Sequence, residues 1–476
     1  MGHPRDDLPL IGEALDLARE AAGRYLERLP DDPVRTPEAE SAVRALAGPL
    51  PDDGDGTLKA LTALAEAGEA AAIRSAGPRF FHFVVGGATP AGLGADWLTS
   101  ALDQNVGMWA ASPFAAELEG VAIDWLKELF ELPAEWGGLL VTGATMANYV
   151  GLACARRWWG LEHGVDVDEQ GLSALPPMTV LSSGHVHVST VKALGMLGVG
   201  RAQVERISRD TVGRLDLEGL HRRLEGLNGA PAILIANAGE VNAGDFDPLP
   251  EMMEAARAHK TWVHVDGAFG LFSRVTPRTK ELTQGIERAD SVISDGHKWL
   301  NVPHDCGFVF VRNPNLLAGV FGPSASYYVG GGDRQPNFAL LGPESSRRAR
   351  ALAVWATLRA YGRRGYREMV ERHLDLAQRL VGHIDADPDF QRFDAVKLNI
   401  VCFRYRPRGF PDAQLDELNE RLGRAVLEDG RVYVGTSRYE GNVVFRPAIV
   451  NYRTTEEDID TLYETLRVLG AAALRG

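Results

Sequence analysis

The 476-residue sequence predicts an α/β fold built on a mainly parallel sheet, and two patterns support this prediction. First, short continuous apolar runs recur between about residues 138 and 311, as is typical of strands buried on both faces. Second, helix-like stretches separate several of these runs, as a parallel sheet covered by helices requires. The expected strands are 138–142, 178–182, 232–236, 262–266, 291–294 and 307–311, and the expected helices are 145–158, 187–197, 215–227 and 248–259.

The N-terminal segment predicts a separate helical arm. Residues 10–29 place their apolar side chains on one helical stripe, and a second helix is expected at about 57–74. The polar, proline-rich stretch 30–56 between them is typical of a linker. Such a segment cannot bury both faces alone, so we expect residues 1–78 to form an arm that packs on a partner subunit.

The pattern changes again near residue 347, where one long helix is expected as far as about residue 380. A smaller α+β unit follows, so we expect a large domain over 79–350 and a small C-terminal domain over 351–476. In the small domain the expected strands lie near 398–404 and 443–449, and the expected helices near 412–429 and 455–473.

Composition excludes several classes of partner. The formal net charge of −14 and the pI near 5.4 argue against nucleic acid, because little positive charge is available to neutralise phosphates. No apolar run approaches the roughly 18–20 residues that a membrane span needs, and the N-terminus lacks an apolar signal core. Cys154, Cys306 and Cys402 are few and far apart, which favours a reducing cytoplasm over a disulfide framework. We therefore expect a cytoplasmic protein.

The chemistry is most strongly indicated by Ser-Asp-Gly-His-Lys-Trp at 294–299, which follows the apolar run that ends at Asp266 by about thirty residues. A partly buried lysine is a usable amine nucleophile, and a buried carboxylate can stay ionised beside a cationic ring nitrogen. Pyridoxal 5′-phosphate requires both groups, so Lys298 and Asp266 point to this cofactor. The alternative is that Lys298 is a surface lysine and Asp266 caps a strand.

Two further sites fit a cofactor with a phosphate group and a substrate with a carboxylate. Val141-Thr-Gly-Ala-Thr-Met-Ala-Asn148 joins a strand to a helix, so Gly143, Ala144 and Thr145 can seat a phosphate at the helix N-terminus. Thr145 as an ordinary N-cap is the alternative. Arg446 lies inside an apolar strand, where an arginine needs a carboxylate partner from either the protein or a substrate.

The histidines allow a rival hypothesis. His185 and His187 form a His-x-His pair that, with His264 and Asp266, could bind a metal ion in a metal-dependent hydrolase. Against this, no carboxylate accompanies the pair locally, and Lys298 would have no role. A structural role in the core is a third possibility for each histidine, while His187 could also lie flat over an aromatic ring.

These motifs resemble those of the pyridoxal-phosphate-dependent group II amino-acid decarboxylases, which include the aromatic-L-amino-acid and glutamate decarboxylases. The resemblance extends from about Gly77 to the segment Val450-Asn-Tyr-Arg-Thr-Thr, with six landmarks in the family's order. They include Trp109-Ala-Ala-Ser-Pro, Glu117-Leu-Glu, His-Val-Asp266-Gly-Ala, Asp295-Gly-His-Lys298-Trp and Asp305-Cys. The resemblance implies the aspartate-aminotransferase-type fold (fold type I), with a seven-stranded sheet, and a homodimer whose active sites are shared.

The same resemblance implies roles for individual residues. Lys298 would form the Schiff base with the cofactor, Asp266 would pair with the pyridine nitrogen, and His187 would stack on the ring face opposite Ala268. His187 or a loop tyrosine would return a proton to Cα after carbon dioxide leaves. The phosphate would be held by Gly143, Ala144, Thr145 and His297, and the ring hydroxyl would lie near Asn242. The substrate carboxylate would bind Arg446. The substrate site would be lined by Phe83 and Trp109, in part from the partner subunit.

Departures from the family pattern bear on the substrate and the product. Val84, Val85 and Gly86 stand where aromatic-substrate members are bulkier, which predicts extra room for a large aromatic or apolar side chain. Apart from Arg79, no basic cluster marks a second carboxylate site, so an acidic substrate is disfavoured. The catalytic loop is expected near 324–343, with candidate tyrosines Tyr327 and Tyr328 and with Phe338 at a position where the family uses tyrosine. A phenylalanine there would favour an aldehyde synthase or amino-acid oxidase on the same scaffold.

Overall fold

The centre of the molecule is a seven-stranded sheet in the order β1-β7-β6-β5-β4-β2-β3. A computed structural model describes residues 3–36, 39–322 and 336–474. Strand β7 is antiparallel to both neighbours, and the other pairs are parallel, which confirms the predicted mainly parallel sheet. The strands are β1 (Gly137–Val141), β2 (Val180–Ser182), β3 (Val204–Arg206), β4 (Ala232–Asn237), β5 (Thr261–Asp266), β6 (Ser291–Asp295) and β7 (Gly307–Val311).

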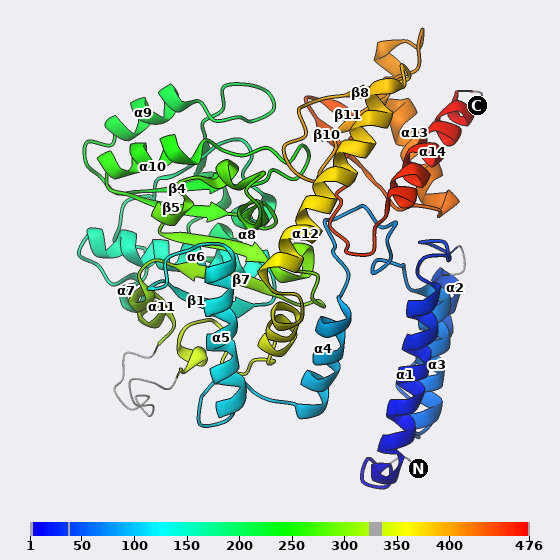
Figure 1. The fold of residues 1–476 in the computed structure, drawn as a ribbon. Helices are drawn as coiled ribbons and strands as arrows, with labels where there is room; N and C mark the ends of the chain where they lie inside the picture. Colours follow the sequence, from blue (N-terminus) through cyan, green and yellow to red (C-terminus); the bar gives the residue numbers. More distant parts are fainter. Residues whose placement is uncertain (1–2, 37–38, 323–335, 475–476) are drawn as a thin grey trace.

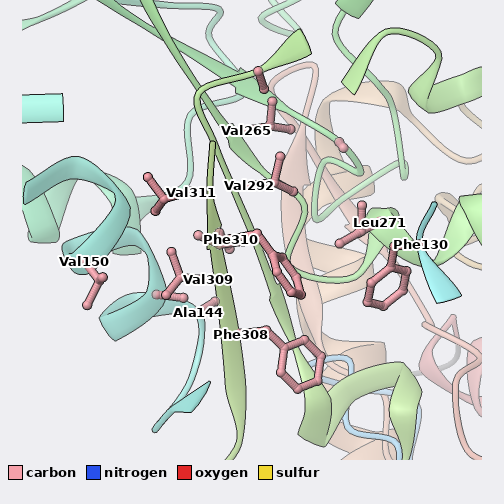
Figure 2. Close-up of a cluster of buried hydrophobic side chains, with 14 of the residues drawn as sticks. Phe130, Ala144, Val150, Val265, Leu271, Val292, Phe308, Val309, Phe310 and Val311 are labelled. Carbon is pink, nitrogen blue, oxygen red and sulfur yellow. The ribbon is translucent and has the colours of Figure 1, made fainter. Parts of the chain in front are cut away.

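Helices cover both faces of this sheet (Figure 1). Figure 2 shows that successive side chains of β7 point to opposite faces of the sheet. Val309 and Val311 point toward Val150, and Phe308 and Phe310 point the other way, toward Phe130. Every residue of β7 is buried, because the pleat sends successive side chains into different halves of one core. The helices of this domain are α4 (Pro90–Leu102), α5 (Pro113–Leu129), α6 (Ala144–Glu162), α7 (Val167–Gln170), α8 (Val188–Met196), α9 (Leu217–Glu225), α10 (Leu249–Ala258) and α11 (Pro314–Phe321).

A second, smaller sheet lies toward the C-terminus, antiparallel and in the order β10-β11-β9-β8. It has its own apolar core, and the long helix α12 (Ala351–Ala386) extends between the two sheets (Figure 1). The backbone of α12 breaks at Gly362, whose φ of 60° favours glycine. The other elements are β8 (Phe390–Arg392), β9 (Phe403–Tyr405), α13 (Leu415–Asp429), β10 (Thr436–Tyr439), β11 (Asn442–Phe445) and α14 (Glu456–Ala473).

The N-terminal helices form a pair that stands apart from the large sheet (Figure 1). Helix α1 (Ile11–Arg28) packs along α3 (Thr57–Ala71), and α2 (Ala39–Ala45) lies where only a linker was expected. Neither α1 nor α3 contains a buried residue, and the apolar side chain of Leu15 is exposed. Within the described parts of the chain, no helix is both long and apolar enough to cross a membrane.

Candidate active site

Lys298 lies at the edge of a cavity of about 360 Å³ at the carboxyl ends of the parallel strands. Strand β6 ends at Asp295, and the turn of π-helix that follows (Gly296–Leu300) carries the lysine. The Lys298 side chain is 17% exposed, and its Nζ lies 3.1 Å from Asp295 Oδ2 and 5.9 Å from the centre of the Phe269 ring. The lysine therefore faces a cavity of the size that holds a cofactor.

Asp266, the last residue of β5, lines the same cavity. Its Oδ2 accepts hydrogen bonds from Asn148 Nδ2 at 3.0 Å and Thr190 Oγ1 at 2.8 Å, and its Oδ1 accepts one from the Ala268 N–H at 3.2 Å. Burial acts to raise the pKa of Asp266, but nearby His187, the two side-chain donors and Lys298 together lower it below its ordinary value. Asp266 is thus held as a carboxylate beside the cavity.

The end of the cavity formed by the first turn of α6 has N–H groups that are suited to an anion. The Ala144 N–H donates to Asp295 Oδ1 at 2.5 Å, and Asp295 Oδ2 lies 3.1 Å from Lys298 Nζ, so this turn lies near the lysine. A Cβ atom at Gly143 would lie 3.1 Å from His297 Cε1, so glycine lets the backbone come close to that ring. Within the described residues, the buried Nδ1 of His297 has no hydrogen-bond partner. A phosphate group fits this set of donors, and Thr145 lines the same end.

His187 also lies at the cavity, as the N-cap of α8. Its Nδ1 lies 2.7 Å from Ser189 Oγ, which fixes the ring. Burial lowers the pKa of His187, and the charges of Lys298 and Arg446 lower it further while Asp266 opposes them. A neutral ring fixed above the cavity can stack on a flat cofactor, and Ala268 lines the cavity as well.

The metal hypothesis finds no ligand set. Across the described residues, no group of three or more histidine, cysteine, aspartate or glutamate side chains is placed to hold a metal ion. His264 is instead hydrogen-bonded to Ser291 Oγ and Asn148 Oδ1, and His185 Nε2 lies 3.8 Å from Asp245. His185 and His187 share the cavity wall but have no third ligand beside them.

Asn242 does not line the cavity, contrary to the sequence-based expectation. Its Nδ2 donates to Glu240 Oε1 at 2.6 Å, and its Oδ1 accepts from Ser437 Oγ at 2.7 Å. Both ends of the amide are therefore used, one within the turn after β4 and the other to bond this turn to β10 of the smaller sheet. Glu240 and Val241 stand at the cavity instead.

Arg446 lies next to the cavity wall, directly after β11. One of its terminal nitrogens donates to the Val241 carbonyl at 3.1 Å, and its buried Nε has no partner among the described residues. Burial lowers the pKa of Arg446, and the charge of Glu240 opposes that shift. Arg446 thus keeps hydrogen-bonding capacity for another acceptor.

Phe83 and Trp109 lie away from the cavity of their own chain. Phe83 is 60% exposed and, like Val84, has a positive φ, so consecutive non-glycine residues hold a conformation that most side chains avoid. Trp109 Nε1 donates to Glu117 Oε1 at 2.8 Å. A contribution from either residue to an active site would therefore have to be made in a neighbouring subunit.

The predicted extra room is not found at Val84 or Gly86 within this chain. Val84 is buried in the core, and a Cβ atom at Gly86 would lie 1.8 Å from the Lys298 carbonyl oxygen. The missing side chain of Gly86 therefore admits the Lys298 backbone and not a substrate. Phe338 is also buried in the core, beneath the Arg347 guanidinium, whereas Tyr327 and Tyr328 lie outside the described residues. Phe338 therefore does not occupy a proton-donor position in its own subunit.

Sequence reasoning missed four polar residues at or beside the cavity. Asn148 and Asp295 stand inside the motifs quoted above but were given no role of their own, and Thr190 and Glu240 stand in no motif. The only signal was position, because Asn148 follows the proposed phosphate seat by one turn of helix and Asp295 precedes the lysine by three residues.

Comparison with known proteins agrees with this geometry. Residues 58–406 match the family model described as "Pyridoxal-dependent decarboxylase conserved domain". The chain is 30% identical over 399 residues to an aromatic-L-amino-acid decarboxylase of Bacillus atrophaeus, covering 82% of this chain and 81% of the relative. It is also 30% identical over 438 residues to an L-2,4-diaminobutyrate decarboxylase of Rhizobium meliloti (strain 1021), covering 88% and 84%. The solved structure of Oryza sativa TDC with PLP and tryptamine superposes with a TM-score of 0.90 at 23% identity over 98% of both chains, which confirms the fold.

Proposed function

Since the chain belongs to the pyridoxal-dependent decarboxylase family, we propose that it removes the α-carboxylate from an L-amino acid with an aromatic or bulky apolar side chain. The protein is a carboxy-lyase that uses pyridoxal 5′-phosphate, and the proposal concerns its substrate and the roles of its residues. The observation that carries the residue roles is that Lys298, Asp266 and the first turn of α6 line one cavity.

Bound pyridoxal 5′-phosphate supplies an aldehyde that condenses with amines and a cationic ring that accepts an electron pair. In our proposal Lys298 Nζ is the amine that holds the cofactor before substrate arrives. Asp266 keeps a proton on the ring nitrogen, because the carboxylate stays ionised in its buried position. The first turn of α6 and His297 hold the phosphate, and His187 covers one face of the ring.

Arg446 has the role of orienting the substrate. Its free hydrogen-bonding capacity beside Val241 would bind the α-carboxylate, so that the bond to be broken stands perpendicular to the cofactor ring. In our proposal His187, whose ring is fixed at the cavity by Ser189, returns the proton to Cα. Only the protonated ring can do this; the lowered pKa makes that form a stronger acid, and the charge of Asp266 favours it. The products would be an amine and carbon dioxide.

The charged residues near the site favour an uncharged side chain on the substrate. Arg79 already donates to the carbonyls of Pro30 and Asp32, so it does not offer a second carboxylate site. Both oxygens of Glu240 already accept hydrogen bonds from Asn242, which leaves this carboxylate less able to bind a side-chain amine. The aromatic-L-amino-acid decarboxylase relative agrees with this choice, and the diaminobutyrate decarboxylase relative defines the main competitor.

We further propose a homodimer with shared active sites. Helix α4, the start of α5 and the segment between them expose several large apolar side chains, which are candidates for a contact with a second subunit. The unburied helices of residues 1–78 would pack on the partner. Residues 79–350 would then form the cofactor domain and 351–476 the small domain. The exposed apolar residues are Trp97, Leu98, Leu102, Met108 and Phe114.

One set of measurements tests these proposals. Purified protein loaded with pyridoxal 5′-phosphate is reduced with borohydride, and the modified peptide should contain Lys298, whereas the exposed Lys260 serves as the control position. Carbon dioxide and amine are then measured with the twenty amino acids, L-2,4-diaminobutyrate, DOPA and 5-hydroxytryptophan. Preferred turnover of diaminobutyrate or an acidic amino acid would refute the substrate proposal. Aldehyde, ammonia and hydrogen peroxide as products would favour the aldehyde synthase alternative.

A further inference from the structure

A continuous chain of hydrogen bonds runs behind Asp266, away from the cavity. Asn148 Nδ2 donates to Asp266 Oδ2 at 3.0 Å, and Asn148 Oδ1 lies 2.8 Å from His264 Nε2. His264 Nδ1 lies 2.7 Å from Ser291 Oγ, which accepts from Trp262 Nε1 at 3.1 Å. Asn148, His264 and Ser291 are fully buried, so water does not complete or replace any of these bonds.

The direction of each bond follows from the carboxylate end. An ionised Asp266 accepts only, so the amide of Asn148 turns its NH₂ group to Asp266 and its oxygen to His264. His264 Nε2 must then carry the proton. Burial lowers the pKa of His264 to about 4, so the ring is neutral and its Nδ1 accepts from the Ser291 hydroxyl. Every donor in the chain therefore points toward Asp266.

Helix α6 is shaped to receive this histidine. Gly151 lies three residues after Asn148, on the same face of the helix. A Cβ atom at Gly151 would lie 2.9 Å from His264 Cε1 and 3.0 Å from His264 Nδ1, so only glycine leaves room for the ring. The steric fit at Gly151 is independent of the hydrogen bonds and selects the same ring position.

We propose that Asn148 and His264 are positioning residues that fix the orientation and the negative charge of Asp266 for the decarboxylation reaction. Thr190 supplies a second donor to Asp266 Oδ2, but it lies on another element, at the start of α8. The groups that bear on the charge of Asp266 from the elements packed against it are His264 on its own strand, His187 at the start of α8, and Lys298 after β6. This inference rests on the role proposed above for Asp266.

The test compares variants loaded with pyridoxal 5′-phosphate. In Asn148→Leu, Asp266 loses a donor while it stays buried, so it takes up a proton at higher pH. We expect the acid limb of the kcat profile to move up by about one pH unit, which is about 1.4 kcal/mol, and the affinity for pyridoxal 5′-phosphate to fall about tenfold. His264→Leu should do the same. His264→Gln keeps a side-chain N–H and should restore most of the wild-type profile.

Two further variants separate positioning from general destabilisation. Asn419→Leu removes an equally buried amide in the small domain, where Asn419 bonds to the backbone of Tyr405 and Leu415, and should lower only the melting temperature. Gly151→Ala should displace His264 and shift the pH profile although alanine favours the helix. If Asn148→Leu lowers the melting temperature as Asn419→Leu does but leaves the pH profile and cofactor affinity unchanged, the positioning role is refuted.

Asp266→Ala separates the role proposed for Asp266 from the positioning role proposed for Asn148 and His264. If this variant keeps wild-type affinity for pyridoxal 5′-phosphate, the role proposed for Asp266 itself fails, and the inference about Asn148 and His264 fails with it. If Asp266→Ala loses affinity while both Asn148→Leu and His264→Leu behave as wild type, only the positioning role is overturned. Cofactor affinity is measured by quenching of protein fluorescence without substrate, so this result does not depend on turnover.

Discussion

The substitution Gly86→Ala should displace the lysine that we propose holds the cofactor. The Gly86 N–H donates to the His297 carbonyl at 3.2 Å, and a Cβ atom at Gly86 would lie 1.8 Å from the Lys298 carbonyl oxygen. The same Cβ would lie 2.8 Å from Asn301 Nδ2. The backbone φ of Gly86 is not in the left-handed region, so alanine is conformationally allowed and its only cost is the collision.

The size of the effect follows from that distance. Non-bonded heavy atoms approach to about 3.5 Å, so the segment around Gly86 and the Lys298 turn must separate by roughly 1.5 Å. Overpacking of this kind costs about 1–3 kcal/mol of stability. Because the obstructing atom is backbone and the next neighbour, Asn301, is fully buried, the turn cannot relax by rotating a side chain. A misplacement of about 1 Å at a catalytic group costs about a hundredfold in rate.

Gly382→Ala is the matched control, because Gly382 lies in α12 and a Cβ atom there meets nothing within 4 Å. Thermal unfolding, borohydride trapping of the cofactor and kcat are measured for both variants. We expect Gly382→Ala to be as stable as wild type or more so, by up to about 1 kcal/mol. Wild-type trapping and kcat in Gly86→Ala would show that the Lys298 turn is not confined by this segment, and the steric argument would be refuted.

Three other predictions concern stability and the lysine turn. Glu119→Gln should lower the free energy of unfolding in urea by about 3–5 kcal/mol, because Arg347 loses its counter-charge at 2.8 Å in a fully buried pair. Asp96→Asn removes a charge from a surface pair and should change stability by less than about 1 kcal/mol. Equal effects of the two substitutions would contradict this prediction. His373 is buried with a pKa lowered to about 3 mainly by burial, so the folded state binds fewer protons than the unfolded state. This residue should lower stability by about 1.4 kcal/mol per unit as pH drops below about 6.5, in addition to His82 and His264, whose pKa burial also lowers. His373→Gln should reduce the slope of stability against pH by that amount, and an unchanged slope would exclude a contribution from His373. Asn301→Ala should lower stability by about 2–4 kcal/mol and reduce cofactor trapping, and a variant that loses stability but traps normally would show that Asn301 acts on the fold alone.

The sequence was most informative where local composition determines structure. The run ending at Asp266 is buried along nearly its whole length, so its continuous apolar pattern identified a central strand almost to the residue. Asp266 ends β5 and Lys298 follows β6, and these two strands are parallel neighbours in the sheet. The two residues therefore lie at the same edge of the sheet. Strand β3 was missed because its short sequence, Val-Glu-Arg, has only one buried residue and resembles a loop.

Long-range contacts explain the failures. Gly86 lies more than 200 residues before Lys298, so nothing in the local pattern shows that a backbone fills the space beside it. Asn242 was expected near the ring hydroxyl because the family resemblance implied it, but its amide is held by Glu240 within the turn and by Ser437 of β10. In both cases the residue was expected to contact cofactor or substrate, but a distant part of the chain contacts it instead.

The turn that carries Lys298 is hydrogen-bonded through Asn301 to two segments that are distant in the sequence, one near Thr89 and one near Val450. Asn301 donates to the carbonyls of Trp299 and Val450 and accepts from the Tyr452 N–H, so the C-terminal segment is bonded to the turn. The Asn301 carbonyl accepts from the Thr89 N–H, so the segment that follows Gly86 is bonded to it as well. Apart from the bond to Trp299, these bonds join segments that are more than 100 residues apart in the sequence. A substitution that shifts the segment 450–452 should therefore displace Lys298, which we propose holds the cofactor, although that segment does not line the cavity.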